Sequence, residues 1–224
     1  SNLLHPFYMI KAVIFDAGDL VYYRDEETLR PILDFLGKKR GVSAKEFIES
    51  YDKYSLQLYK GKISKDGHLK KILEYLKIKF DDKFFNEFAA VFRQNFSNIK
   101  IRENAHAAFE EIKSLGIKIG ILTDTATTEE KKWEWFRKIN LAQFVDVIVC
   151  SSVTGYTKDQ KEAYEAILGK LNVKPQNVIF VGHKEYEMKG ARLAGIKSVS
   201  TEKDAKGDYF IDDISEIPGL IKKL

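Results

Sequence analysis

Asp16 is the first residue whose surroundings suggest chemistry. It follows the apolar run Val13-Ile14-Phe15, which is typical of a buried strand, and it precedes Ala17-Gly18, which is typical of a turn. In open parallel sheets, ligands bind in the crevice beyond the carboxyl ends of the strands. A carboxylate at that point can act as a nucleophile or hold a cation, so the sequence predicts a functional aspartate rather than a turn cap.

Polar residues also follow three later apolar runs. These runs are residues 117–122 before Thr123, residues 145–149 before Ser151, and residues 178–181 before Gly182-His183. A lysine, Lys158, stands shortly after the second of them in the pattern Gly155-x-x-Lys158. Because parallel strands end at the same edge of a sheet, we expect these side chains to meet Asp16.

Helices and strands must alternate to bring these residues together. From residue 99 onward, segments with apolar residues at helical spacing separate the short apolar runs. The chain is predicted to finish with edge strands at 197–200 and 208–211 and a helix over 214–224. Strands joined through helices pair in parallel through right-handed crossovers. The predicted fold class is therefore α/β, a doubly wound parallel sheet of Rossmann type.

Residues 20–98 have no strand pattern and instead predict four short-linked amphipathic helices. The first has apolar residues from Leu29 to Leu36, and the second opens at the capping box Ser43-x-x-Glu46. Starts near Ser64 and Asp81 are predicted for the other two. Such a segment predicts a small helical bundle inserted after the first strand, beside the crevice.

Taken together, the motifs resemble those of the haloacid dehalogenase superfamily, most of whose members are phosphatases. The matches, in chain order, are Asp16-x-Gly-Asp-Leu, Leu122-Thr123-Asp124, Gly155-x-x-Lys158, and Gly182 followed by Glu187 and Gly190-Ala191. The resemblance implies a core domain over residues 1–20 and 99–224. It also implies that residues 21–98 form a four-helix cap domain that closes over the strand ends and selects the substrate.

The resemblance assigns roles to the matched residues. Asp16 would be the nucleophile that forms an aspartyl-phosphate, Thr123 would donate a hydrogen bond to the phosphoryl group, and Lys158 would neutralise charge. The implied cofactor is Mg²⁺, held by Asp16, the Gly18 carbonyl and Glu187.

Two positions depart from the family pattern. Gly18 stands where the phosphatases usually have a second aspartate that acts as general acid and base, and His183 stands where an aspartate usually follows the glycine. The departures predict a weakened acid and metal site, suited to good leaving groups. His183 could bond to Asp16 or the phosphoryl group, ligate a borderline metal such as zinc or manganese, or fill space without a catalytic role.

Substrate contacts are expected on the first tether and at a loop of the insert. The candidates are Tyr22, Arg24 and Lys62, together with Asp124 beside Thr123. The alternative for the tyrosine is that it packs the hinge, and for the lysine that it is simply exposed.

Composition limits the classes of function and partner. The 224 residues carry 37 basic and 33 acidic side chains spread along the chain, so the net charge of +4 does not predict nucleic-acid binding. A single cysteine, Cys150, excludes an intrachain disulfide framework. With no apolar stretch near the roughly 20 residues that cross a bilayer, a cytoplasmic protein without membrane contact is expected. The oligomeric state is left open.

The leading hypothesis is a phosphatase of a small phosphorylated metabolite. One alternative is a metal-independent hydrolase of the dehalogenase type, in which Arg24 would hold a substrate carboxylate. The other is a non-catalytic scaffold that binds a phosphorylated ligand or another protein.

Overall fold

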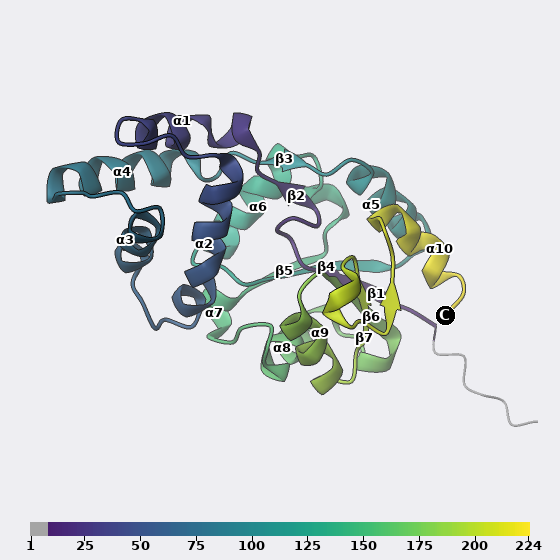
Figure 1. Cartoon of the computed structure of the whole chain (residues 1–224). Coiled ribbons are helices and arrows are strands. Elements are labelled where there is room, and N and C mark those ends of the chain that lie inside the picture. The colour runs from purple at the N-terminus through teal and green to yellow at the C-terminus, as the bar shows by residue number, and fades with distance from the viewer. Residues whose placement is uncertain (1–8) are drawn as a thin grey trace, which may run out of the picture.

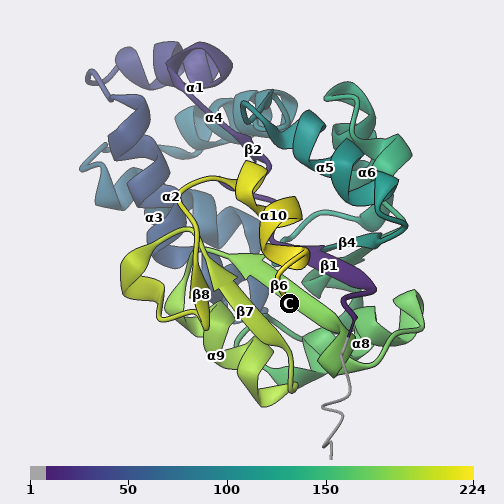
Figure 2. The ribbon, with the colours of Figure 1, turned by 90° about the vertical axis from the view of Figure 1, so that its right-hand side faces the viewer.

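A six-stranded parallel sheet forms the centre of the computed structural model, which describes residues 9–224 (Figures 1 and 2). The strands are β1 (Ala12–Phe15), β4 (Lys118–Thr123), β5 (Val147–Cys150), β6 (Val178–Gly182), β7 (Lys197–Ser200) and β8 (Tyr209–Phe210). Their order is β5-β4-β1-β6-β7-β8, and every pairing between neighbours is parallel. The predicted fold class is confirmed. The first part of the predicted core range, residues 1–8, lies outside the described residues.

Both faces of the sheet are covered by helices, which explains why β1 reads as a continuous apolar run. Val13 and Phe15 belong to the core formed with α5 (Ala105–Ser114), α6 (Glu129–Lys138) and α10 (Ile217–Ile221). Ala12 and Ile14 belong to the core on the opposite face, formed with α8 (Lys161–Leu171) and α9 (Glu185–Leu193). With β1 in the middle of this sheet, Asp16 is carried to the centre of the strand ends.

Four helices between Tyr23 and Lys100 form a separate layer (Figure 1). They are α1 (Glu26–Gly37), α2 (Ala44–Tyr59), α3 (Lys65–Tyr75) and α4 (Asp82–Asn95). Ser43, Ser64 and Asp81 cap the last three, as predicted, because each side-chain oxygen accepts the backbone N–H three residues on. These helices bury their own apolar core, in which Phe47 and Phe88 are fully enclosed.

The prediction that residues 20–98 contain no strand was wrong. Tyr22–Tyr23 forms β2, which pairs antiparallel with β3 (Lys100–Ile101) and so joins the two tethers of the helical segment. A strand of two residues is too short to produce a recognisable alternation of apolar and polar residues. The pairing sets Tyr22 and Arg24 beside the strand ends of the main sheet.

The remaining elements are short. The structure adds α7 (Ser151–Thr154) and four 3₁₀ turns at Ala142–Phe144, Pro175–Asn177, Lys203–Ala205 and Ile214–Glu216. The last of these replaces the beginning of the helix predicted over residues 214–224. Across residues 9–224, every helix is too short or too polar to span a lipid bilayer.

Candidate active site

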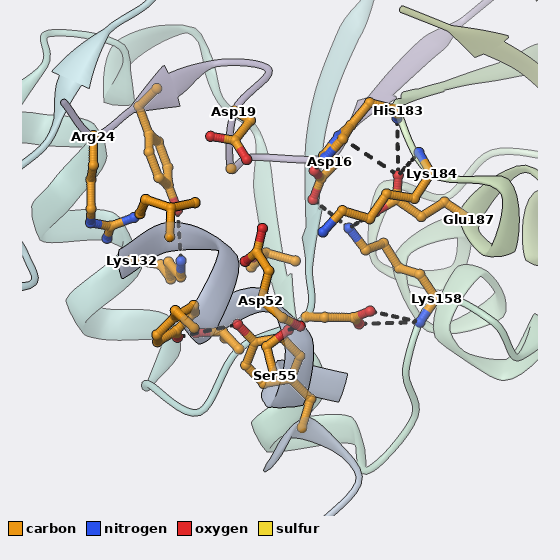
Figure 3. A pocket seen from close by; sticks show the side chains of 18 of the residues that line it. Asp16, Asp19, Arg24, Asp52, Ser55, Lys132, Lys158, His183, Lys184 and Glu187 are labelled. Carbon is orange, nitrogen blue, oxygen red and sulfur yellow. Dashed lines mark hydrogen bonds and ion pairs between the residues drawn. The ribbon is translucent and has the colours of Figure 1, made fainter. Parts of the chain in front are cut away.

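A cavity of about 110 Å³ lies between the carboxyl ends of the central strands and helix α2 (Figure 3). Asp16 enters it from the end of β1, Thr123 from the end of β4, and His183 from the residue after β6. Lys158 reaches it from the loop between α7 and α8. The four residues predicted to be catalytic therefore line one cavity, as the parallel arrangement of the strands led us to expect.

Lys158 is the central cation of this site. It is only 2% exposed, and its Nζ forms ion pairs with Asp16 and with Glu187, the latter at 2.7 Å. Burial favours the neutral amine, but the carboxylates of Asp16, Glu187 and Asp124 outweigh it and raise the pKa of Lys158 well above its ordinary value. For Asp16, burial opposes ionisation, yet Lys158 and His183 hold its pKa below the ordinary value of 3.8. At neutral pH, Asp16 is thus an ionised carboxylate.

His183 lies against the same carboxylate. Its Nδ1 is 3.3 Å from Asp16 Oδ2 and 4.0 Å from Glu187 Oε2, and neither ring nitrogen has a hydrogen-bond partner among residues 9–224. Burial lowers the pKa of the ring, but the neighbouring Asp16 carboxylate raises it above its ordinary value overall.

Asp16, His183 and Glu187 could also hold a cation. One potential ligand atom from each lies within 4.8 Å of the other two. Two carboxylates suit Mg²⁺, but an imidazole is a poor ligand for it and a good one for zinc or manganese. The donor set therefore fits a divalent cation, but it offers one hard oxygen ligand fewer than a site with three carboxylates.

Glu187 is set by the start of helix α9. Its Oε2 accepts the backbone N–H groups of His183 at 3.0 Å and Lys184 at 3.1 Å, which satisfies two donors at the helix N-terminus. Its other oxygen contacts Lys158. One buried carboxylate therefore links the helix terminus to the central lysine.

Gly18 leaves space in the cavity. A Cβ built at this position has no atom within 4 Å, and its φ lies outside the left-handed region. The next residue, Asp19, adopts a left-handed φ of 61° and is exposed. The chain therefore turns at Asp19, and Gly18 could carry a side chain without strain.

Gly190 matters for packing, because a Cβ there would overlap the carbonyl oxygen of Lys158. We expect Gly190→Ala to lower the melting temperature and to displace the loop that carries Lys158, because the backbone of that loop must move to make room. Gly169→Ala in α8 is the matched control, because its Cβ meets nothing within 4 Å, and it should stabilise the protein slightly. Equal melting temperatures for the two variants would contradict this account of Gly190.

The predicted substrate contacts are divided by the structure. Tyr22, Arg24 and Asp124 line the cavity, whereas Lys62 is exposed and does not. Its neighbour Lys60 instead forms an ion pair with Asp159, next to Lys158. Burial raises the pKa of Asp124 to about 6.

Several cavity residues were not identified from the sequence. They are Asp52 and Ser55 from α2, Lys132 and Trp135 from α6, and Lys184 before α9. Lys132 had a detectable signal, because it stands four residues before Phe136 on the apolar face of α6, where a lysine is unusual. Asp52 had no such signal in the sequence, since charged residues are common on the polar face of an amphipathic helix.

Comparisons with known proteins agree with this geometry. A family model described as haloacid dehalogenase-like hydrolase matches residues 10–195. A glyceraldehyde 3-phosphate phosphatase of Methanocaldococcus jannaschii is 24% identical, over 96% of this chain and 99% of that protein. The pyrophosphatase PpaX of Bacillus mycoides is 27% identical over 54% of this chain and 60% of its own length. The L-2-haloacid dehalogenase of Xanthobacter autotrophicus superposes with a TM-score of 0.75 at 15% identity, over 96% of this chain and all of that one.

Proposed function

This chain belongs to the haloacid dehalogenase-like hydrolases, and we propose that it is a phosphatase acting on a small phosphorylated metabolite through an aspartyl-phosphate. The observation that carries the proposal is the ion pair between Asp16 and the buried Lys158, in a cavity that also contains Thr123. The two relatives named as phosphatase and pyrophosphatase support phosphoryl chemistry.

In the proposed reaction, an Asp16 oxygen attacks phosphorus and the bond to the leaving-group oxygen breaks. Lys158 and the Thr123 hydroxyl stabilise the negative charge on the phosphoryl oxygens. Water then hydrolyses the acyl phosphate and regenerates the carboxylate. A divalent cation held by Asp16, Glu187, His183 and the Gly18 carbonyl would supply further charge neutralisation.

Proton donation to the leaving group needs a carboxylic acid other than residue 18. Asp124 is the candidate, because its pKa of about 6 keeps part of it protonated near neutral pH. Its carboxylate accepts the backbone N–H of Lys158 at 3.1 Å, which holds it at the edge of the cavity.

The helical segment fits the role of a lid. We propose that residues 21–98 form a cap domain on a core of residues 9–20 and 99–224. Helix α2 contributes Asp52 and Tyr59 to the cavity, and Lys60 at its end forms an ion pair with Asp159 of the core. Such a lid would exclude water and supply contacts specific to the substrate.

A panel of phosphate monoesters, pyrophosphate and 2-haloacids, with and without Mg²⁺, tests the proposal. We expect cation-dependent phosphate release from at least one small ester and no halide release. Halide release without a cation would favour the dehalogenase alternative, for which Arg24 in the cavity is the supporting observation. Binding of a phosphorylated compound without any turnover would favour a non-catalytic protein.

The metal site yields a separate prediction. His183→Asp should tighten Mg²⁺ binding by about tenfold or more, because a hard oxygen ligand replaces an imidazole beside Asp16 and Glu187. Calorimetric titration without substrate measures this, with His106→Asp, a change on helix α5, as the control. Unchanged or weaker Mg²⁺ affinity would mean that residue 183 does not reach the ion.

A further inference from the structure

Arg24 and Lys132 lie at the end of the cavity opposite Asp16 and Lys158 (Figure 3). Neither cation forms an ion pair within residues 9–224, whereas Lys158 has two carboxylate partners. Lys132 is buried and Arg24 is half-buried, and removing such a cation from water without a counter-ion costs free energy, which a bound anion would recover. The roles described above for phosphoryl transfer leave these two side chains unused.

Lys132 is enclosed by aromatic groups. It is 4% exposed, its Nζ donates to the Tyr22 hydroxyl at 2.8 Å, and it lies 4.1 Å from the centre of the Trp135 ring. An ammonium group has three protons, and the remaining two have no acceptor among the described residues. Burial, followed by repulsion from Arg24, lowers the pKa of Lys132 to about 7.

Arg24 is held rigidly beside it. Its Nε donates to the Phe96 carbonyl at 2.8 Å, and its guanidinium lies 3.9 Å from the centre of the Phe96 ring and 5.4 Å from that of Trp135. These contacts occupy one donor and leave the terminal nitrogens without an acceptor in residues 9–224. A fixed guanidinium next to an ammonium suits the recognition of a carboxylate.

We propose that Arg24 and Lys132 form a second anion subsite, which binds a carboxylate of the substrate while the phosphoryl group lies at Asp16. The inference rests on the proposed function and specifies its substrate class, a phosphate ester of a short carboxylic acid. The cavity of about 110 Å³ is small for a ligand pocket, which favours a substrate with a short carbon chain.

Two matched pairs of probes test the subsite: 3-phosphoglycerate against glycerol 3-phosphate, and 2-phosphoglycolate against 2-hydroxyethyl phosphate. Calorimetry on an Asp16→Asn background measures binding without turnover. We expect each carboxylic acid to bind at least about tenfold more tightly than its partner without a carboxylate. Adding Lys132→Met or Arg24→Met should remove that preference and change the affinity for the esters without a carboxylate by less than about threefold.

Lys131→Met is the matched control, because Lys131 is exposed on the same helix and should leave the preference intact. In the parent protein, Lys132→Met should raise KM for the acids by about 10- to 100-fold with a smaller change in kcat. Since Arg24→Met probes the same subsite from another element, a folding defect in one variant leaves the other as a test.

The outcomes separate the two proposals. Equal binding of the esters with and without a carboxylate, or a preference that survives both substitutions, overturns the subsite even if the esters are hydrolysed. Binding of the acids that depends on Lys132, without hydrolysis of any ester, supports the subsite and overturns the phosphatase proposal.

Discussion

Asp16→Asn should reduce the hydrolysis of phosphate esters by a factor on the order of 10⁴, because an amide cannot attack phosphorus. The fold should persist, since Lys158 keeps its ion pair with Glu187 at 2.7 Å and the site loses one buried carboxylate. Steady-state rates of phosphate release measure the first effect, and thermal unfolding measures the second.

The matched control is Asp34→Asn, which makes the same chemical change at an exposed position on helix α1. It should keep the parental rate. If purified Asp16→Asn also keeps that rate, Asp16 is not the nucleophile, and the covalent route through this residue must be abandoned.

Lys158→Met should be the most destabilising single change at the site. It leaves two buried carboxylates, Asp16 at 5% and Glu187 at 1% exposure, without their shared cation. Removing one partner of a buried ion pair typically costs about 3–5 kcal/mol of unfolding free energy. Lys161→Met removes an exposed lysine that pairs with Glu165 and should change the unfolding free energy by less than about 0.5 kcal/mol.

The loss should depend on pH in a defined direction. In the parent, the pKa of Asp16 is depressed below 3.8, so its ion pair contributes stability above that pH, which is lost as the pH falls through the depressed value. Without Lys158, burial instead raises the pKa of the carboxylate, and ionisation destabilises the fold as the pH rises above about 4. The difference in melting temperature between parent and variant should therefore be large at pH 7 and shrink toward pH 4.

A difference that is small at pH 7, or that grows on acidification, would contradict this description of the ion pairs. Chemical denaturation at the two pH values provides an independent measurement.

Local patterns in the chain were sufficient to predict the sheet and the starts of three helices. Val13 and Phe15 read as strand because both faces of β1 are buried, and Ser43, Ser64 and Asp81 read as helix starts because each caps backbone groups within three residues. These signals depend on neighbours in sequence. The two-residue strands β2 and β3 were not predicted, because each is too short to show an alternation and the four cap helices separate them in sequence.

Part of the candidate site could be predicted from the sequence, because it depends on where the strands end. Asp16, Thr123 and Lys158 could be expected to converge, since they follow strands that end at one edge of the sheet. The sequence could not show where the loop of Lys62 lies, and the structure leaves this lysine exposed outside the cavity. The catalytic roles of Asp16, Thr123 and Lys158 stay predictions.

The sequence by itself determined the fold class and the polar residues at the strand ends, because burial and capping are written in short stretches of chain. Only the tertiary structure decided that Lys158 also pairs with Glu187, and that Lys132 meets Tyr22 across 110 positions. Those contacts depend on how helices α6 and α9 pack on the sheet. Packing of that kind is set by the complementary shapes of distant surfaces, and no local pattern records it.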